Sequence, residues 1–85
     1  MYHVYILKSK KNQSLYIGYT SDIENRLQKH NNGLVGYTKK YRPWKLVYYE
    51  TFTSLRDAMK REKNLKYFGK AYGQLKKRIK GSLNI

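Results

Sequence analysis

Hydrophobic and polar positions alternate in two short runs near the start of the chain. The runs cover residues 2–8 and 15–19, both are rich in aromatic and β-branched side chains, and a short polar turn separates them. This pattern predicts a β-hairpin. Because side chains alternate between the two faces of a strand, Tyr5 and Tyr16 are able to converge on one face. Gly18 lies on the same face of the strand as Tyr16 and has no side chain, which would let another group approach the sheet closely at this position.

A helical pattern follows the hairpin. Ser21 and Glu24 have the spacing of an N-terminal capping box, which predicts a helix start at this point. The helix is expected to run to about Asn32, with Gly33 as its C-terminal stop.

Two polar residues lie on the inward side of this predicted helix. Ile23 and Leu27 mark its buried face. At about 100° per residue, Arg26 is roughly 60° from Ile23 and His30 roughly 20° from it. An inward arginine is unusual, so both residues are candidate functional groups. A hydrogen-bonded helix histidine without a catalytic role is an equally good interpretation of His30 from spacing alone.

The middle of the chain predicts a loop, a third strand and a second helix. Residues 34–43 have no regular period and combine aromatic residues with cations, as in a loop that contacts a phosphate backbone. Residues 44–51 read as a strand, and Thr53 or Ser54 is expected to cap the following helix.

Glu62 takes an inward position of the second helix. The apolar stripe of this helix consists of Leu55, Ala58, Met59 and Leu65. Glu62 continues this stripe seven residues after Leu55, and an unpaired buried carboxylate is costly. We therefore expect Glu62 to have a cation, a metal ion or a shifted pKa. An ion pair with Arg26 and a metal-binding or catalytic role are equally compatible with the pattern.

The last part of the chain predicts a break and a basic helix. Residues 66–70 combine two aromatic side chains with a glycine and cations. From about Ala71 the pattern is helical, with Leu75 and Ile79 facing inward and lysines facing water.

Net charge narrows the choice of partner. Lys and Arg number 19 against five Asp and Glu, which gives a formal charge of +14. Nucleic acid, with DNA first, is the polyanion expected to bind such a small aromatic-rich protein. The candidate contacts are cations of the predicted loop and of the break: Lys39, Lys40, Arg42, Lys66 and Lys70.

Other compositional facts exclude several classes. The chain has no cysteine, so disulfides and thiolate-bound zinc are excluded. It shows neither an export signal nor an apolar run long enough to span a membrane, so a cytoplasmic location and no membrane partner are expected.

The order of these residues resembles that of the GIY-YIG nuclease family. Tyr16-Ile17-Gly18 matches the second family motif fully, whereas Val4-Tyr5-Ile6-Leu7 stands where the first motif has Gly-Ile-Tyr, with Tyr5 at the tyrosine. Arg26, His30 and Glu62 follow at matching places. Residues 16–22 are similar to short stand-alone bacterial members that resemble the nuclease domain of the excision-repair UvrC protein.

The resemblance implies a fold, an activity and roles for residues. Residues 1–85 would form a single α+β domain, with a small three-stranded, mainly antiparallel sheet flanked by about three helices. The implied activity is metal-dependent DNA endonuclease action in a repair setting, with Mg²⁺ or Mn²⁺ held by Glu62 and no other cofactor. Arg26 would hold the scissile phosphate. Tyr5 or Tyr16 would be the general base, and His30 would orient Tyr16 or relay the proton.

Several alternatives stay open at this level. A noncatalytic nucleic-acid-binding module on the same fold is the main alternative, and a ribosome-associated protein is a third class. Many family members carry a late asparagine, for which Asn64 and Asn84 are the candidates, and neither is assigned. With no separate DNA-reading domain, we expect selection of a nucleic-acid shape, such as a branch, flap or single strand, over a base sequence. The patterns do not predict the oligomeric state.

Overall fold

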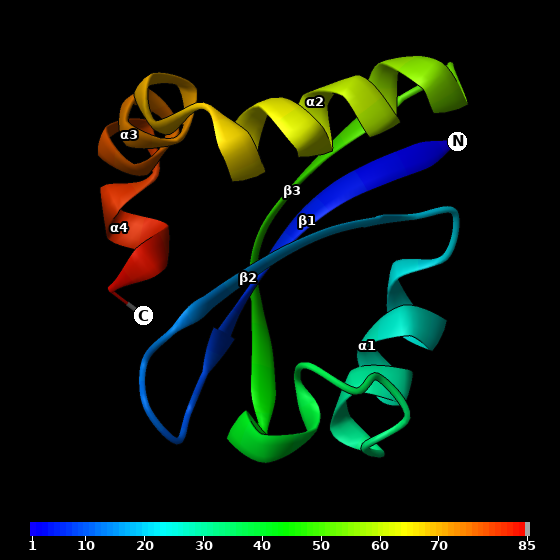
Figure 1. The fold of residues 1–85 in the computed structure, drawn as a ribbon, viewed down its shortest axis with the longest axis vertical. Helices are drawn as coiled ribbons and strands as arrows, with labels where there is room; N and C mark the ends of the chain where they lie inside the picture. The colour runs from blue at the N-terminus through cyan, green and yellow to red at the C-terminus, as the bar shows by residue number, and fades with distance from the viewer. Residues whose placement is uncertain (85) are drawn as a thin grey trace.

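The computed structural model describes residues 1–84 and has the predicted α+β fold (Figure 1). Its strands are β1 (Tyr2–Ser9), β2 (Leu15–Thr20) and β3 (Trp44–Phe52). Its helices are α1 (Ile23–Asn31), α2 (Leu55–Tyr67), α3 (Gly69–Arg78) and α4 (Lys80–Leu83), and a 3-10 helix, η1 (Lys39–Tyr41), lies in the predicted loop. The hairpin and the third strand are thus confirmed.

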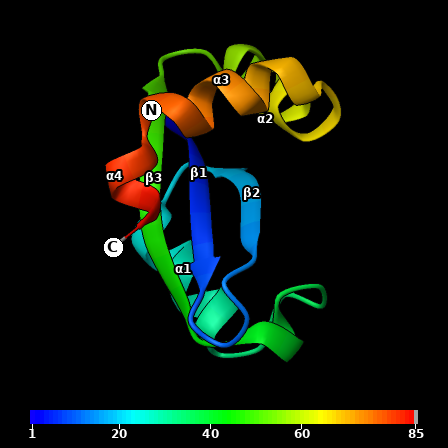
Figure 2. The same cartoon turned by 90° about the vertical axis from the view of Figure 1, so that its left-hand side faces the viewer.

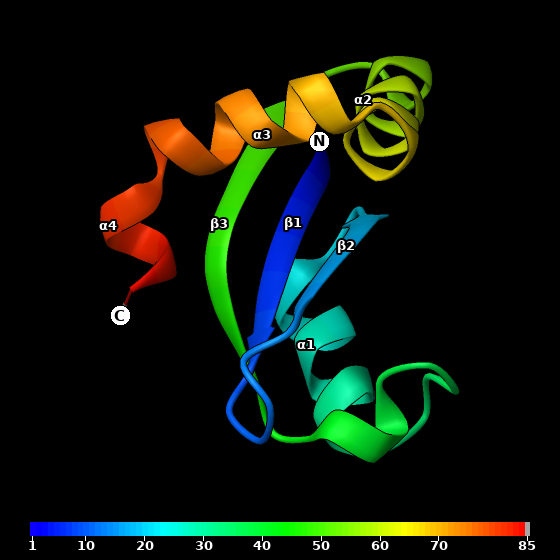
Figure 3. The same ribbon diagram turned by 60° about the vertical axis from the view of Figure 1, so that its left-hand side comes forward.

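The three strands form one antiparallel sheet in the order β2-β1-β3. The central strand β1 is buried from Val4 to Leu7, because it has a neighbour on each side and helices on each face. Helices α2 and α3 lie across one end of the strands, and α1 lies toward the other end (Figures 2 and 3).

Alternation of side chains along β1 divides the core into two clusters. The aliphatic cluster comprises Val4, Ile6, Ile17, Ala58, Leu65, Leu75 and Ile79. The aromatic cluster comprises buried Tyr5, Leu7 and Trp44, with half-buried Tyr16, Leu27, Tyr41 and Leu46 around them. The aliphatic cluster joins the sheet to α2 and α3, and the aromatic cluster joins it to α1 and the loop before β3.

Helix α1 begins one residue later than the capping box predicted. Asp22, rather than Ser21, is the N-cap, and its carboxylate accepts a hydrogen bond from the backbone N–H of Asn25 at 3.1 Å. A charged acceptor also interacts favourably with the positive end of the helix. The predicted stop at Gly33 is confirmed, since this residue has a φ of 75°, which favours glycine.

Helix α2 buries a narrower stripe than predicted. Ser54 is its N-cap, as expected, and Ala58 and Leu65 are buried against the sheet. Leu55 and Met59 are instead 42% and 41% exposed. These two side chains lie about 60° and 100° around the helix from Ala58, so they point past the sheet.

The break before the last helices is also shorter than predicted. Helix α2 continues to Tyr67 and α3 starts at Gly69, so Phe68 alone separates them. Leu75 and Ile79 are buried, as predicted. No helix within residues 1–84 has both the length and the apolar content that a membrane span requires.

Candidate active site

The hairpin places the phenol of Tyr5 directly over Gly18. The two residues are cross-strand partners in the β1–β2 pair. A Cβ atom at position 18 would lie 2.5 Å from the Tyr5 hydroxyl oxygen, closer than any tolerated contact. Gly18 therefore makes room for the Tyr5 ring, in agreement with the expected close approach at this position. The Tyr5 and Tyr16 rings also converge, with centroids 6.4 Å apart.

A directed chain of hydrogen bonds runs inward from Tyr5. Its hydroxyl lies 2.9 Å from Nε2 of His30, and Nδ1 of His30 lies 2.7 Å from Oγ1 of Thr38. The Thr38 hydroxyl donates to the carbonyl oxygen of Val35 at 3.2 Å. Because this donation uses the only Thr38 proton, Nδ1–H of His30 must be the donor to Thr38. Nε2 is then the acceptor for the Tyr5 hydroxyl.

Burial keeps both members of the Tyr5–His30 pair uncharged. Burial, with a smaller contribution from nearby Arg26, lowers the pKa of His30 to about 4. Burial also raises the pKa of Tyr5 to about 12, although Arg26 partly opposes this shift. Desolvation of the Tyr5 phenolate therefore outweighs the effect of the nearby cation in the free protein.

Arg26 lies on the inward side of α1, as its spacing predicted. The nearby Tyr5 hydroxyl raises the pKa of its guanidinium, and Tyr16 adds to this shift. Its Nε atom is buried and has no hydrogen-bond partner among residues 1–84. A buried unpaired N–H is costly, so this guanidinium has unused capacity to bind an anion.

Glu62 does not form the ion pair with Arg26 that was one of the two expectations. Its carboxylate instead pairs with Lys66 at 3.0 Å, one turn further along α2. The Glu62 side chain is only 13% exposed, against 34% for Lys66. This i,i+4 geometry is favourable for a Glu that precedes a Lys, so the helix itself supplies the partner.

One cleft brings together residues from four elements. It has a volume of about 310 Å³ and is lined by Tyr5, Tyr16, Gly18, Tyr19, Arg26 and Glu62. Four of the five predicted catalytic residues thus share one cavity. His30 is fully buried behind Tyr5 and takes no part in the lining. The His30 ring forms a hydrogen bond with Tyr5. Its contact with Tyr16 is an edge-to-face ring contact, with the two ring centroids 4.9 Å apart.

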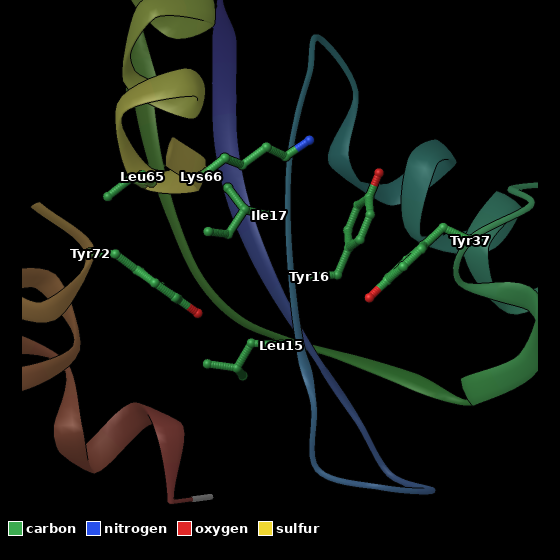
Figure 4. A pocket seen from close by; sticks show the side chains of 7 residues that line it. All are labelled: Leu15, Tyr16, Ile17, Tyr37, Leu65, Lys66 and Tyr72. Carbon is green, nitrogen blue, oxygen red and sulfur yellow. The ribbon is translucent and has the colours of Figure 1, made fainter. Parts of the chain in front are cut away.

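A second and larger pocket lies on the other side of Tyr16 (Figure 4). Its volume is about 460 Å³, and its lining comprises Leu15, Tyr16, Ile17, Tyr37, Leu65, Lys66 and Tyr72. Tyr16 therefore lines both cavities, and Lys66 of this pocket pairs with Glu62 of the cleft. The Lys66 ammonium lies 5.7 Å from the centre of the Tyr16 ring, which is a cation–π distance.

The five predicted nucleic-acid contacts are all exposed but fall into two groups. Lys39, Lys40 and Arg42 lie in or next to η1, and the Nε of Arg42 donates to the Lys39 carbonyl oxygen. Lys66 lies in the last turn of α2 and Lys70 in the first turn of α3. The two groups belong to separate elements, although Lys66 shares a pocket with Tyr37 of the loop that carries the first group.

Three residues that support the site had no signal in the sequence pattern. Thr38 is fully buried in the aperiodic loop, and its carbonyl oxygen accepts a hydrogen bond from Nε1 of Trp44 at 2.8 Å. Asn31, at the end of α1, exchanges two hydrogen bonds with the backbone of Trp44. These contacts join α1, the loop and β3. The candidate asparagines Asn64 and Asn84 do not line the cleft.

The fold is a small α+β domain with a polar cleft beside the hairpin, and sequence comparison gives its family. The family model described as the GIY-YIG catalytic domain matches residues 1–74, so this chain belongs to the GIY-YIG family. Membership places it in a nuclease superfamily whose members act on nucleic acid and generally depend on a divalent metal.

Similar proteins carry the name UPF0213. The UPF0213 protein of Staphylococcus saprophyticus is 49% identical over 70 residues, which are 81% of this chain and 84% of the relative. That of Clostridium perfringens is 48% identical over 67 residues, or 78% and 71% of the two chains. The solution NMR structure of the Bacillus halodurans UPF0213 protein has 35% identity and a TM-score of 0.57, and the match covers 95% of this chain and 87% of that one. These names specify no substrate.

Proposed function

We propose that residues 1–85 act as one metal-dependent endonuclease domain that hydrolyses phosphodiester bonds, with DNA as the substrate. The observation that carries this proposal is the Arg26 guanidinium, whose buried Nε–H lacks a partner within the described chain. It lies in the same cleft as Glu62, Tyr5 and Tyr16. A phosphate oxygen satisfies this N–H and shares charge with the guanidinium, and stabilisation of this kind is central to phosphodiester cleavage.

The hydrogen-bond chain supports Tyr5 rather than Tyr16 as the proton acceptor. A pKa of about 12 keeps Tyr5 protonated, so it accepts a proton from the attacking water only as it loses its own. The neutral Nε2 of His30, 2.9 Å away, is the acceptor for that second proton. Thr38 holds the other nitrogen of the ring in place. Tyr16 then orients the water or the phosphate.

The donor set at the cleft fits a hard divalent cation. Within the described residues, no cluster of three or more His, Cys, Asp or Glu side chains is able to hold a metal ion, and Glu62 is the carboxylate that lines the cleft. Mg²⁺ suits one carboxylate because it keeps several waters and takes phosphate oxygens as further ligands. In the free protein Lys66 neutralises Glu62, and a metal ion that binds this carboxylate would replace that contact. When bound, Mg²⁺ or Mn²⁺ would supply Lewis-acid stabilisation of the phosphate and the leaving oxygen.

A panel of nucleic acids tests this function. We would measure Mg²⁺-dependent nicking of duplex, branched, flapped and single-stranded DNA and RNA by the wild type and by Glu62→Ala and Arg26→Ala. Both variants should lose nicking and retain salt-sensitive binding. Glu24→Ala is the matched control, since Glu24 is an exposed carboxylate in the first turn of α1.

The panel also separates the alternatives. Nicking that is unchanged in Glu62→Ala and Arg26→Ala would contradict the catalytic assignment. Binding without nicking in any divalent metal would favour the noncatalytic module, for which the Glu62–Lys66 ion pair is the supporting observation. Branched or single-stranded DNA should be preferred, and cutting at one defined sequence in random duplex DNA would refute selection by shape.

A further inference from the structure

The pocket beside the cleft has the composition of a site for a flat aromatic group. It spans the edge strand β2: Leu15, Ile17, Leu65 and Tyr72 lie on one side of the strand, and Tyr16 and Tyr37 lie on the other. Figure 4 shows the hydroxyls of Tyr37 and Tyr72 directed toward the middle of the pocket from opposite sides. Lys66 is the charged residue of the lining. Apolar walls with a few convergent polar groups are typical of small-molecule and base-binding sites.

Exposure of Tyr37 also points to a ligand. Its side chain is 67% exposed although it lies against Tyr16, with ring centroids 5.9 Å apart and a tilt of 31°. Tyr37 belongs to the loop before β3, whose cations are among the predicted nucleic-acid contacts. A large aromatic ring left open to water beside a second tyrosine offers stacking surface to any base, because every base has a π face.

Tyr16 connects this pocket to the cleft. One side of its ring faces the pocket, and the same residue lines the cleft that contains Arg26 and Glu62. If a phosphate binds at Arg26, the nucleotide next to it is able to reach the pocket past Tyr16. We propose that this pocket, defined by Tyr16, Tyr37 and Tyr72, binds one unpaired nucleobase next to the scissile phosphate. Lys66 lines the pocket, pairs with Glu62 of the cleft and offers its charge to the connecting backbone.

The proposal deepens the proposed function, on which it rests, because it explains how a small domain selects shape. A paired base has both faces stacked and its hydrogen-bonding edge occupied. Only a base that has left the duplex is able to present a face to Tyr37 and an edge to the hydroxyls. Branches, flaps and single strands supply such bases without the cost of opening a duplex.

Binding without metal tests the pocket separately from the chemistry. In EDTA, the affinity of the whole protein for oligothymidylate would be compared with its affinity for an abasic phosphodiester chain of the same length. The wild type should prefer the chain with bases by about tenfold or more, the size expected for base stacking. Tyr37→Ala should remove most of this preference, whereas Tyr37→Phe should keep most of it. The salt dependence should be unchanged, because the phosphate contacts remain.

Tyr49→Ala is the matched control, because Tyr49 is 53% exposed on β3 and does not line the pocket. It should leave the preference intact, and circular dichroism would verify that all variants are folded. Equal affinity of the wild type for both chains, or equal losses in Tyr37→Ala and Tyr49→Ala, would overturn the proposal. A base preference that depends on Tyr37 but comes with no metal-dependent nicking would support the pocket and overturn the nuclease. Metal-dependent nicking without a base preference would support the nuclease and overturn the pocket.

Discussion

The two faces of the sheet are built by different physical means. On one face the aliphatic cluster packs seven buried side chains without a hydrogen-bonding group among them. On the other face the aromatic cluster surrounds a chain of buried polar groups from Tyr5 through His30 to Thr38, each with a partner. Dispersion and the hydrophobic effect have little directional preference, whereas hydrogen bonds fix atoms in place.

This difference assigns separate roles to the two faces. The aliphatic face stabilises the fold and tolerates changes that preserve volume. The aromatic face positions the Tyr5 hydroxyl, and it fails when one partner is removed, because the remaining buried group is left unpaired. The cleft opens where the elements of both faces meet, since Glu62 comes from α2 and Arg26 from α1. Variants on the two faces should therefore separate stability from activity.

The largest effect on stability is expected from Leu75→Ala. Leu75 is 2% exposed in the aliphatic cluster, and such a truncation costs about 2–5 kcal/mol of the free energy of unfolding. A small domain has about 5–15 kcal/mol in total, so this is a major loss. Nicking per folded molecule should be unchanged. Urea unfolding would measure the loss, and Leu34→Ala, at a position 71% exposed, should change stability by less than about 0.5 kcal/mol.

Arg26→Ala should have the opposite effects to Leu75→Ala: a large loss of nicking and little change in stability. Loss of a group that stabilises charge in the transition state typically slows a reaction by about 10²–10³-fold. Stability should change little or rise, because the variant removes a buried N–H without a partner. Nicking assays and thermal melts would be compared with those of Arg56→Ala, an exposed arginine on α2. An unfolding loss as large as that of Leu75→Ala would make Arg26 a structural residue.

Acid should weaken the aromatic face selectively. The folded-state pKa of His30 is about 4, below its ordinary value of 6.5. Between these values the unfolded chain binds more protons than the folded one, so stability rises with pH. The contribution, about 3 kcal/mol, is fully present above pH 6.5 and is lost as pH falls toward 4. Urea unfolding at several pH values would measure the slope, and a His30 NMR signal that titrates near pH 6.5 would contradict it.

The sequence correctly predicted the face of the helix or strand on which each candidate catalytic residue lies, because that face depends on the periodicity of a single element. The two-residue period of the hairpin placed Tyr5, Tyr16 and Gly18, and the 3.6-residue period of the helices turned Arg26 and Glu62 inward. Local rules also predicted that Glu62 would have a cation, a metal ion or a shifted pKa, and the structure shows a cation, Lys66, beside it. The spacing of Lys66 is the i,i+4 spacing of such a pair, but the pattern alone does not distinguish it from the inward Arg26 as the partner of Glu62.

Contacts between elements were beyond prediction because no local pattern encodes them. His30 was known to face inward, yet its choice of Tyr5 as hydrogen-bond partner depends on how α1 crosses the sheet. Thr38 lies in an aperiodic loop that is shaped by its bond to Trp44 and by the attachment of Asn31 to the start of β3. The pKa of Tyr5 likewise depends on burial that only the assembled fold provides.

The smallest of the expected effects, from Thr38→Val, tests the direction of the hydrogen-bond chain. Valine keeps the shape of threonine but leaves Nδ1–H of His30 without its acceptor, at a cost of about 1–3 kcal/mol, whereas the Val35 carbonyl keeps the Lys39 N–H as a donor. His30 should then move its proton to Nε2, which would turn the Tyr5 hydroxyl from donor into acceptor and slow nicking. Nitrogen-15 shifts of the imidazole would report this tautomer change. Thr53→Val, at an exposed threonine before α2, should alter neither the tautomer nor nicking. If His30 in Thr38→Val kept its proton on Nδ1 and nicking continued at the wild-type rate, the loop would only pack against the site, and the aromatic face would not differ from the aliphatic face in the way proposed.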